Sequence, residues 1–272
     1  MSNLIARILT ATVLGAVVVF GTLRLPYGFM SGLFALILFG AALEWAQLAG
    51  FVSRTSRVIY GALTVTAALA GALLLRDQDL PLTAMLMLGC GWWCVAAVWV
   101  VHYQRHAGPE VTACAGLALC GWLALIPALA ALLTLLHRGP PLLLALFALV
   151  WGADIFAYFG GKTFGKRRLA SRVSPGKTWE GLTAALLGTQ LLTAGGASLF
   201  KSVPLPALLA LAAVTLAASV VGDLLESLLK RLRGVKDSGN LLPGHGGLLD
   251  RIDSLLAAAP VFTLGFILME QS

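Results

Sequence analysis

The run LPALLALAAVTLAASVVGDLLESLL, residues 205–229, decides the fold of this chain. It is long enough to cross the hydrocarbon core of a bilayer, which takes about 20 apolar residues in a helix. Similar runs recur along the 272 residues, of which 59% are hydrophobic and 11% charged. A soluble domain is about one quarter charged. The sequence therefore predicts an all-α, polytopic integral membrane helix bundle.

About nine membrane helices are expected, separated by short loops that contain glycine, proline and charged residues. No small-residue cleavage site closes the first run before Arg24, so we expect an uncleaved helix there and not a signal peptide. The four cysteines lie inside apolar runs and are interpreted as ordinary helix residues. The expected helices cover residues 5–23, 29–50, 57–75, 81–102, 111–136, 141–160, 179–199, 205–229 and 254–270.

The cationic residues predict how this bundle is oriented. With the N-terminus inside, 15 of the 19 Lys and Arg residues fall on the inner side and 4 on the outer side. The positive-inside rule then gives an N-in, C-out topology, with both charged loops on the cytoplasmic face. Some of these cations belong to a candidate site, so substrate binding as well as topology contributes to the number of Lys and Arg residues on the inner side. We expect the bacterial cytoplasmic (inner) membrane as the location.

A polar stripe runs along the end of the helix at 205–229. Asp223, Glu226, Ser227 and Lys230 follow one another at i, i+3, i+4 and i+7, so they share one helical face. A carboxylate at the bilayer centre costs about 2.5–3.5 kcal/mol, so these acids, with Asp154, should line a polar cavity or bind a cation. The alternative for Glu226 is an ion pair with Lys230 one turn away. Asp223 has no such cation in its own turn.

The segment that follows, residues 227–253, contains eight charged side chains. His245 is flanked by glycines, which permit close backbone approach to a ligand, and is expected near substrate. Asp250 and Asp253 should lie on one face at the start of the ninth helix. Asp253 can equally be an ordinary helix-terminal acid, whereas Asp250 followed by Arg251 suits a metal beside a phosphate.

A third group of polar residues begins in the sixth expected helix. Asp154, Tyr158 and Lys162 are spaced four residues apart and share one helical face. The segment Gly160–Lys166 comes close to a phosphate-binding P-loop, but Arg167 stands where Ser or Thr must bind Mg²⁺. The segment also follows a helix and not a strand, so a P-loop is excluded.

Two of these segments resemble a known family. Residues 227–253 read S-x-x-K-R-x4-K-D-x-G-x-x-L-P-x-H-G-G-x-x-D-R-x-D, which resembles the signature of the phosphatidate cytidylyltransferases, or CDP-diacylglycerol synthases. Residues 174–181, SPGKTWEG, resemble the S-P-x-K-T-x-E-G segment of the same family. Counted from Asp154 to Gly181 and from Ser227 to Asp253, the two matching regions cover about 55 residues. The first five helices carry no motif that adds to the resemblance.

The resemblance implies transfer of the cytidylyl group of CTP to phosphatidate by a divalent-metal-dependent enzyme. Such a reaction needs charge neutralisation, which carboxylate-bound Mg²⁺ and surrounding cations supply. A second cation is an open alternative. The expected catalytic residues are Asp223, Asp250 and Lys177, with Asp223 and Asp250 as metal ligands. The expected substrate-binding residues are Ser174, Lys162, Lys230, Arg231, Lys236, His245 and Arg251. Further candidate metal ligands are Asp154, Glu226, Asp237 and Asp253.

Other functions stay open at this point. A related membrane lipid or polyprenol kinase or phosphotransferase is the nearer alternative, although no Asp-Gly dipeptide of the CDP-alcohol phosphotransferase type occurs. A secondary transporter is less favoured, because the charges lie in two loops and no repeat is visible. We expect an N-terminal region at 1–140 with about five helices and a catalytic region at 141–272 with about four. The expected partners are CTP, phosphatidate, membrane lipid and a second copy of the chain in a homodimer, without nucleic acid.

Overall fold

The structure, a computed structural model, describes residues 15–74, 79–106, 114–200, 202–239 and 246–271. Within these residues, eight helices are long and apolar enough to cross a membrane, and a shorter apolar helix at Gly15–Arg24 precedes them. The eight are α2 (Tyr27–Ala49), α3 (Arg54–Leu74), α4 (Asp79–Arg105), α5 (Cys114–Arg138), α6 (Pro140–Phe164), α7 (Trp179–Gly196), α8 (Leu205–Leu232) and α9 (Leu249–Gln271).

The helical membrane fold predicted from the sequence is confirmed. The first expected helix, 5–23, lies partly outside the described residues. The ninth helix starts at Leu249 and not at residue 254, so Asp250 stands in its first turn. A small addition to the predicted fold is an antiparallel hairpin between α6 and α7, formed by β1 (Arg168–Ala170) and β2 (Ser174–Thr178).

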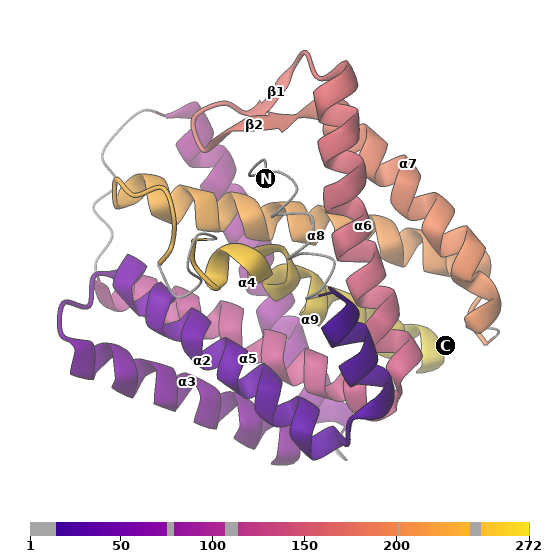
Figure 1. Ribbon diagram of the computed structural model, residues 1–272, viewed down its shortest axis with the longest axis horizontal. Coiled ribbons are helices and arrows are strands. Elements are labelled where there is room, and N and C mark those ends of the chain that lie inside the picture. The colour runs from indigo at the N-terminus through magenta and orange to yellow at the C-terminus, as the bar shows by residue number, and fades with distance from the viewer. Residues whose placement is uncertain (1–14, 75–78, 107–113, 201, 240–245, 272) are drawn as a thin grey trace.

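Helices α6 and α7 form an antiparallel pair along one side of the molecule, and the β1–β2 hairpin joins them at one end (Figure 1). Small residues allow this close approach. A Cβ added at Gly181 would lie 2.8 Å from the carbonyl oxygen of Ala157, and one at Gly160 would overlap the side chain of Ala184. The pair therefore positions the hairpin, and with it Lys177, over the rest of the bundle.

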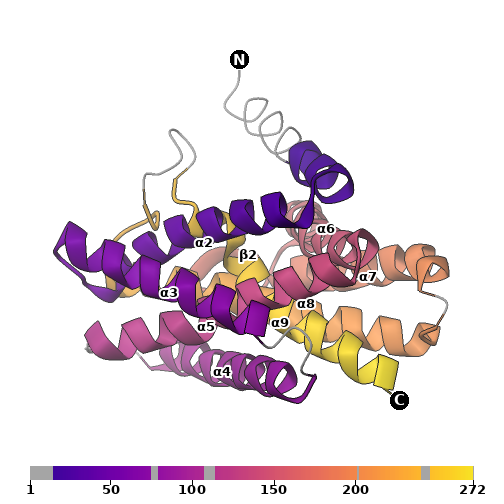
Figure 2. The same cartoon turned by 90° about the horizontal axis from the view of Figure 1, so that it is seen from below.

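The N-terminal helices form the other side of the bundle. Helices α2 and α3 pack on α5, and α4 lies on the opposite side of α5 (Figure 2). Helix α9 contacts α2, α4, α5, α6 and α8, and the buried core extends from Leu129 and Leu133 of α5 to Leu228 of α8 and Ala258 of α9. The predicted division at residue 140 stays a prediction; the larger buried cluster contains residues from both sides of it.

Polar contacts join the helix ends in two groups. The guanidinium of Arg233, just after α8, donates to the carbonyl of Ala49 at the end of α2, at 2.6 Å. Gln104 near the end of α4 bonds to the turn of the β1–β2 hairpin. On the other side, Arg138 at the end of α5 pairs with Glu270 near the end of α9. Ends predicted to share a side of the membrane therefore meet one another.

Candidate active site

One face of α6 lines a cavity beneath the β1–β2 hairpin. Asp154, Tyr158 and Lys162 all border it, as their four-residue spacing predicted, together with Lys177 of β2 and Asp223 of α8. We call this space, of about 380 Å³, the hairpin cavity. The rest of its wall comes from small and apolar residues of α6, α7, α8 and the hairpin, with Ser254 of α9. A nucleotide-sized anion would meet two lysines and two carboxylates here.

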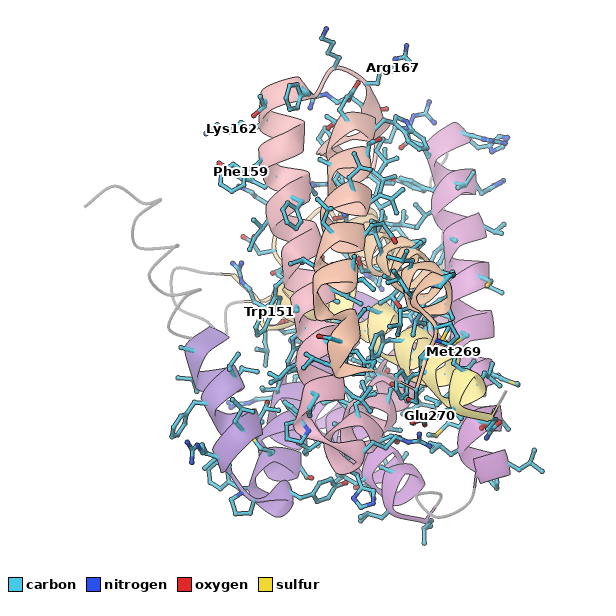
Figure 3. All side chains as sticks on the ribbon, turned by 90° about the vertical axis from the view of Figure 1, so that its right-hand side faces the viewer. Trp151, Phe159, Lys162, Arg167, Met269 and Glu270 are labelled. Carbon is cyan, nitrogen blue, oxygen red and sulfur yellow. The ribbon has the colours of Figure 1, made fainter. Side chains whose placement is uncertain are left out.

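The hairpin is fixed by the residues at the start of α7. Thr178 is the N-cap of this helix, and its Oγ1 accepts from the backbone N–H of Gly181 at 3.1 Å. The carboxylate of Glu180 accepts from the backbone N–H groups of Lys166 and Arg167, at 3.1 and 3.2 Å. The two ends of the hairpin are thereby held together, which sets the position of β2. In Figure 3, Lys162 and Arg167 lie at the hairpin end of the pair, with Glu270 toward the opposite end of the molecule.

Lys177 forms an ion pair with Asp223. Its Nζ lies 2.6 Å from Asp223 Oδ2, and about a quarter of each side chain is exposed, 26% and 27%. The hydroxyl of Ser227 also donates to Asp223 Oδ1 at 3.3 Å. The sequence indicated that α8 itself gives Asp223 no neighbouring cation, and the structure brings that cation from β2 instead.

Asp250 is held by a different set of donors. Its Oδ1 accepts from Lys230 Nζ at 2.6 Å. Its Oδ2 accepts from the backbone N–H groups of Gly247 at 2.8 Å and Ser238 at 3.0 Å, and the Ser238 hydroxyl lies 3.0 Å from the same oxygen. Lys230 also pairs with buried Glu226, which is the ion pair considered as the alternative for that residue.

A second cavity joins these two carboxylates. Asp223 and Asp250 both line a space of about 310 Å³, here called the central cavity, which also includes Asp154, Arg251 and Asp253. The rest of its wall is mainly apolar and comes from the helix at 15–24, α2, α5, α6 and α9, for example through Phe34, Leu129 and Phe147. Asp154, Asp223 and Ser254 border both cavities, so the cavities meet at these residues.

The other residues predicted for the site are spread over α8, α9, the hairpin and the α8–α9 connection. Arg231 donates from Nε to the carbonyl of Val173, at 3.4 Å, so α8 and the hairpin are in contact. Because α9 starts at Leu249, Asp253 lies in its second turn and is not a capping residue; its Oδ1 accepts from the N–H of Ser254 at 2.7 Å. The remaining residues are Ser174, half-buried in β2, Lys236 and Asp237, both exposed, and His245, which lies outside the described residues.

The donor chemistry of this site is compatible with Mg²⁺. Within the described residues, no group of three or more His, Cys, Asp and Glu side chains is arranged to hold a metal ion. Mg²⁺, however, is commonly bound by one or two carboxylates together with substrate phosphates and water. Asp223 and Asp250 on one cavity wall meet that smaller requirement. Their role as metal ligands stays a prediction.

Glu44 of α2 is a residue that the sequence reasoning missed. Only 3% of it is exposed, and its carboxylate accepts from the backbone N–H groups of Leu248 and Leu249 and from the Ser238 hydroxyl. A signal was present, because Glu44 is the one acid in an apolar run of membrane length. Such a residue in a membrane helix is a candidate functional group by default.

Comparison with known proteins gives a consistent result. The model of the cytidylyltransferase family matches residues 5–269 of the chain. A phosphatidate cytidylyltransferase of Pseudomonas aeruginosa is 44% identical over 263 residues, which cover 94% of each protein. One of Brucella abortus is 39% identical over 276 residues, covering 97% of this chain and 93% of the relative. A third, of Haemophilus influenzae, is 41% identical over 205 residues, or 69% of each protein.

Proposed function

Because the chain belongs to the cytidylyltransferase family, we propose that it transfers the cytidylyl group of CTP to phosphatidate, giving CDP-diacylglycerol and pyrophosphate. The observation that carries this proposal is the junction of two unlike cavities at Asp154 and Asp223. The hairpin cavity offers Lys162 and Lys177 for the phosphates of a nucleotide. The central cavity offers a mainly apolar wall, which suits the acyl part of a lipid, beside Arg251 for its phosphate.

The chemistry needs little beyond positioning and neutralisation. A phosphate oxygen of phosphatidate attacks the α-phosphorus of CTP, a new P–O bond forms, and the bond to the bridging oxygen breaks. Pyrophosphate leaves with the electron pair. Since the second pKa of a phosphate monoester is about 6, the attacking oxygen is already ionised near neutral pH, and no side chain has to remove a proton.

The principal obstacle is electrostatic repulsion between the two substrates, which together carry about five to six negative charges. Lys177 and Lys162 would hold the nucleotide phosphates, and Arg251 would hold the lipid phosphate. Asp223 and Asp250 would hold Mg²⁺, which supplies further neutralisation and alignment when bound. This division of labour keeps the acyl chains within the membrane while a polar substrate reaches the same junction.

Isotope transfer tests this function directly. The purified protein, supplied with phosphatidate and Mg²⁺, should move the label of [α-³²P]CTP into lipid and the label of [γ-³²P]CTP into pyrophosphate. A lipid kinase would instead place the γ label in the lipid and release CDP. Absence of both products in a folded preparation would exclude either transferase activity.

We also propose that the protein lies in the bacterial inner membrane with the hairpin and the α8–α9 connection facing the cytoplasm, where CTP is available. The 15-to-4 division of Lys and Arg supports this orientation. In a cysteine-free background, Arg167→Cys and Lys236→Cys should resist an impermeant thiol reagent in intact cells, whereas Arg24→Cys should react. The opposite labelling pattern would reverse the topology.

We also propose that the protein assembles as a homodimer. The molar mass of the purified protein in detergent, corrected for bound detergent, tests this.

A further inference from the structure

Glu44 connects the N-terminal half of the molecule to the candidate active site. Its Oε1 accepts from the N–H of Leu248 at 3.0 Å, and its Oε2 accepts from the N–H of Leu249 at 2.8 Å. The hydroxyl of Ser238 lies 2.9 Å from the same Oε2. All three donors come from the connection between α8 and α9 or from the first residue of α9, about 200 positions away in the sequence.

The two backbone contacts explain why α9 begins where it does. The first N–H groups of an α-helix have no partner inside the helix and must be satisfied by another acceptor. A negative charge at this end also interacts favourably with the helix dipole. Glu44 supplies both from a neighbouring helix, and it does so at a buried position where water is excluded. The start of α9 is therefore set by α2.

The same contacts lead to Asp250. Ser238 lies between the two acids, since its hydroxyl is 2.9 Å from Glu44 Oε2 and 3.0 Å from Asp250 Oδ2. Its one proton can be donated to only one of them at a time, while its backbone N–H donates to Asp250. A Cβ at Gly239 would overlap the Glu44 carboxylate, and one at Gly247 would overlap the Ser238 hydroxyl. The chain is thus folded closely around Glu44.

We propose that Glu44 is a positioning residue, which fixes the first turn of α9 and so orients the Asp250 carboxylate toward the central cavity. The proposal rests on the function proposed above insofar as Asp250 is taken to hold the divalent cation. Glu44 itself lines neither of the two cavities and acts through Ser238 and the backbone of α9. It also gives α2 a specific task in the reaction.

The decisive variant is Glu44→Gln, which keeps the size but replaces one acceptor oxygen with an NH₂ donor. One of the N–H groups of Leu248 and Leu249 would then face another donor. We expect hydrogen exchange in the peptide 246–256 to lose protection by about tenfold or more. We also expect the Mg²⁺ concentration for half-maximal rate to rise by about tenfold, because groups that orient metal ligands change affinity by about 10–100-fold. Glu44→Asp, which keeps the charge, should recover part of both effects.

Trp45→Phe is the matched control. Trp45 is the next residue of α2, is equally buried, and donates from Nε1 to the carbonyl of Leu117 at 2.9 Å, away from α9. Its loss removes one buried hydrogen bond between helices but should change neither the exchange at 246–256 nor the Mg²⁺ concentration required. A general loss of folded protein lowers the total rate without moving that concentration, so the two causes are separable.

Two results would overturn the proposal. One is unchanged exchange at 246–256 in Glu44→Gln, and the other is a lower rate at an unchanged Mg²⁺ requirement. If the wild-type protein transfers no cytidylyl group, the proposed function fails, but the exchange experiment still decides whether Glu44 orders the start of α9. The two failures are therefore distinguishable.

Discussion

Asp223 and Asp250 line the same cavity but are held in opposite ways. Asp250 accepts from two backbone N–H groups in addition to Lys230, with the Ser238 hydroxyl at the same oxygen. Asp223 is bound by the ammonium group of Lys177 and, more weakly, by the Ser227 hydroxyl. The backbone donors cannot leave without a rearrangement of the α8–α9 connection, whereas the lysine has four rotatable side-chain bonds. Asp250 is therefore preset by the fold, and Asp223 keeps an exchangeable partner.

This difference suits a site that receives a polyanion. A phosphate group entering the hairpin cavity can compete with Asp223 for the ammonium group of Lys177, because Asp223 and Lys177 both line that space. Asp223 would then be free to take another cation. The comparison predicts that changes at Asp250 damage structure and activity together, and that changes at Asp223 damage activity alone.

The largest expected effect is that of Asp→Asn at either position. Asp250→Asn and Asp223→Asn should each lower turnover by about 10²–10³-fold or more, the size expected when one electrostatic contact to the reacting phosphates is removed. Only Asp250→Asn should also lower the unfolding temperature in detergent, because its amide NH₂ would face backbone N–H donors. Each donor left without an acceptor costs about 1–3 kcal/mol of folding free energy. Turnover with labelled CTP and thermal unfolding of both variants give the two measurements.

Chelation supplies the control for this pair. EDTA should abolish wild-type turnover, and excess Mg²⁺ should restore the wild type fully but the two Asn variants poorly. Near wild-type turnover in either Asn variant, or activity that survives exhaustive chelation, would remove the carboxylates from metal binding.

Removal of Lys230 and removal of Lys177 should lower the stability of the folded protein by different amounts. Lys230→Ala leaves Glu226 and Asp250 without their shared cation, and both are largely buried, with 2% and 12% of the side chains exposed. Removal of one partner from a buried pair costs about 3–5 kcal/mol. Lys177→Ala affects a more exposed pair and should cost less than about 1 kcal/mol while raising the KM for CTP. Thermal unfolding and steady-state kinetics of the two variants measure this, and equal losses of stability would contradict the comparison.

The smallest expected effect concerns the support of the hairpin. Gln104 donates to the Ser171 hydroxyl at 2.9 Å and accepts from the N–H of Arg172 at 3.0 Å, at an exposed position. Net contributions of such bonds are about 0.5–1.5 kcal/mol each. Gln104→Ala should therefore raise the KM for CTP by only a few-fold and leave the unfolding temperature in detergent unchanged. A loss comparable to that of Lys177→Ala would show that the hairpin needs α4 for its position.

The sequence predicted the helices well because the bilayer imposes their length and apolar character. Helical periodicity also placed Asp154, Tyr158 and Lys162 on one face, and all three line the hairpin cavity. The start of α9 was predicted five residues too late. Its first N–H groups are satisfied by Glu44, a side chain of another helix, and local periodicity does not indicate that contact. Periodicity indicates which residues share a face, but it does not reveal which helix that face meets.

The same limit applies to the candidate site. Lys177 and Asp223 were each selected from the sequence, but their pairing across β2 and α8 was not, since 46 positions separate them and no local rule connects them. The short hairpin was missed for a related reason, as its strands span only three and five residues. Glu44 was noticeable only as an acid among apolar residues, and its partners lie at the other end of the chain.

The wall shared by the two cavities has a kinetic consequence. Because the hairpin cavity and the central cavity are separate spaces that meet at Asp154, Asp223 and Ser254, a nucleotide and a lipid can be bound at the same time. Neither has to vacate the site before the other enters, and no covalent intermediate is required to carry the nucleotidyl group between them. Double-reciprocal plots at several lipid concentrations should then intersect, as they do for a ternary complex, and should not run parallel.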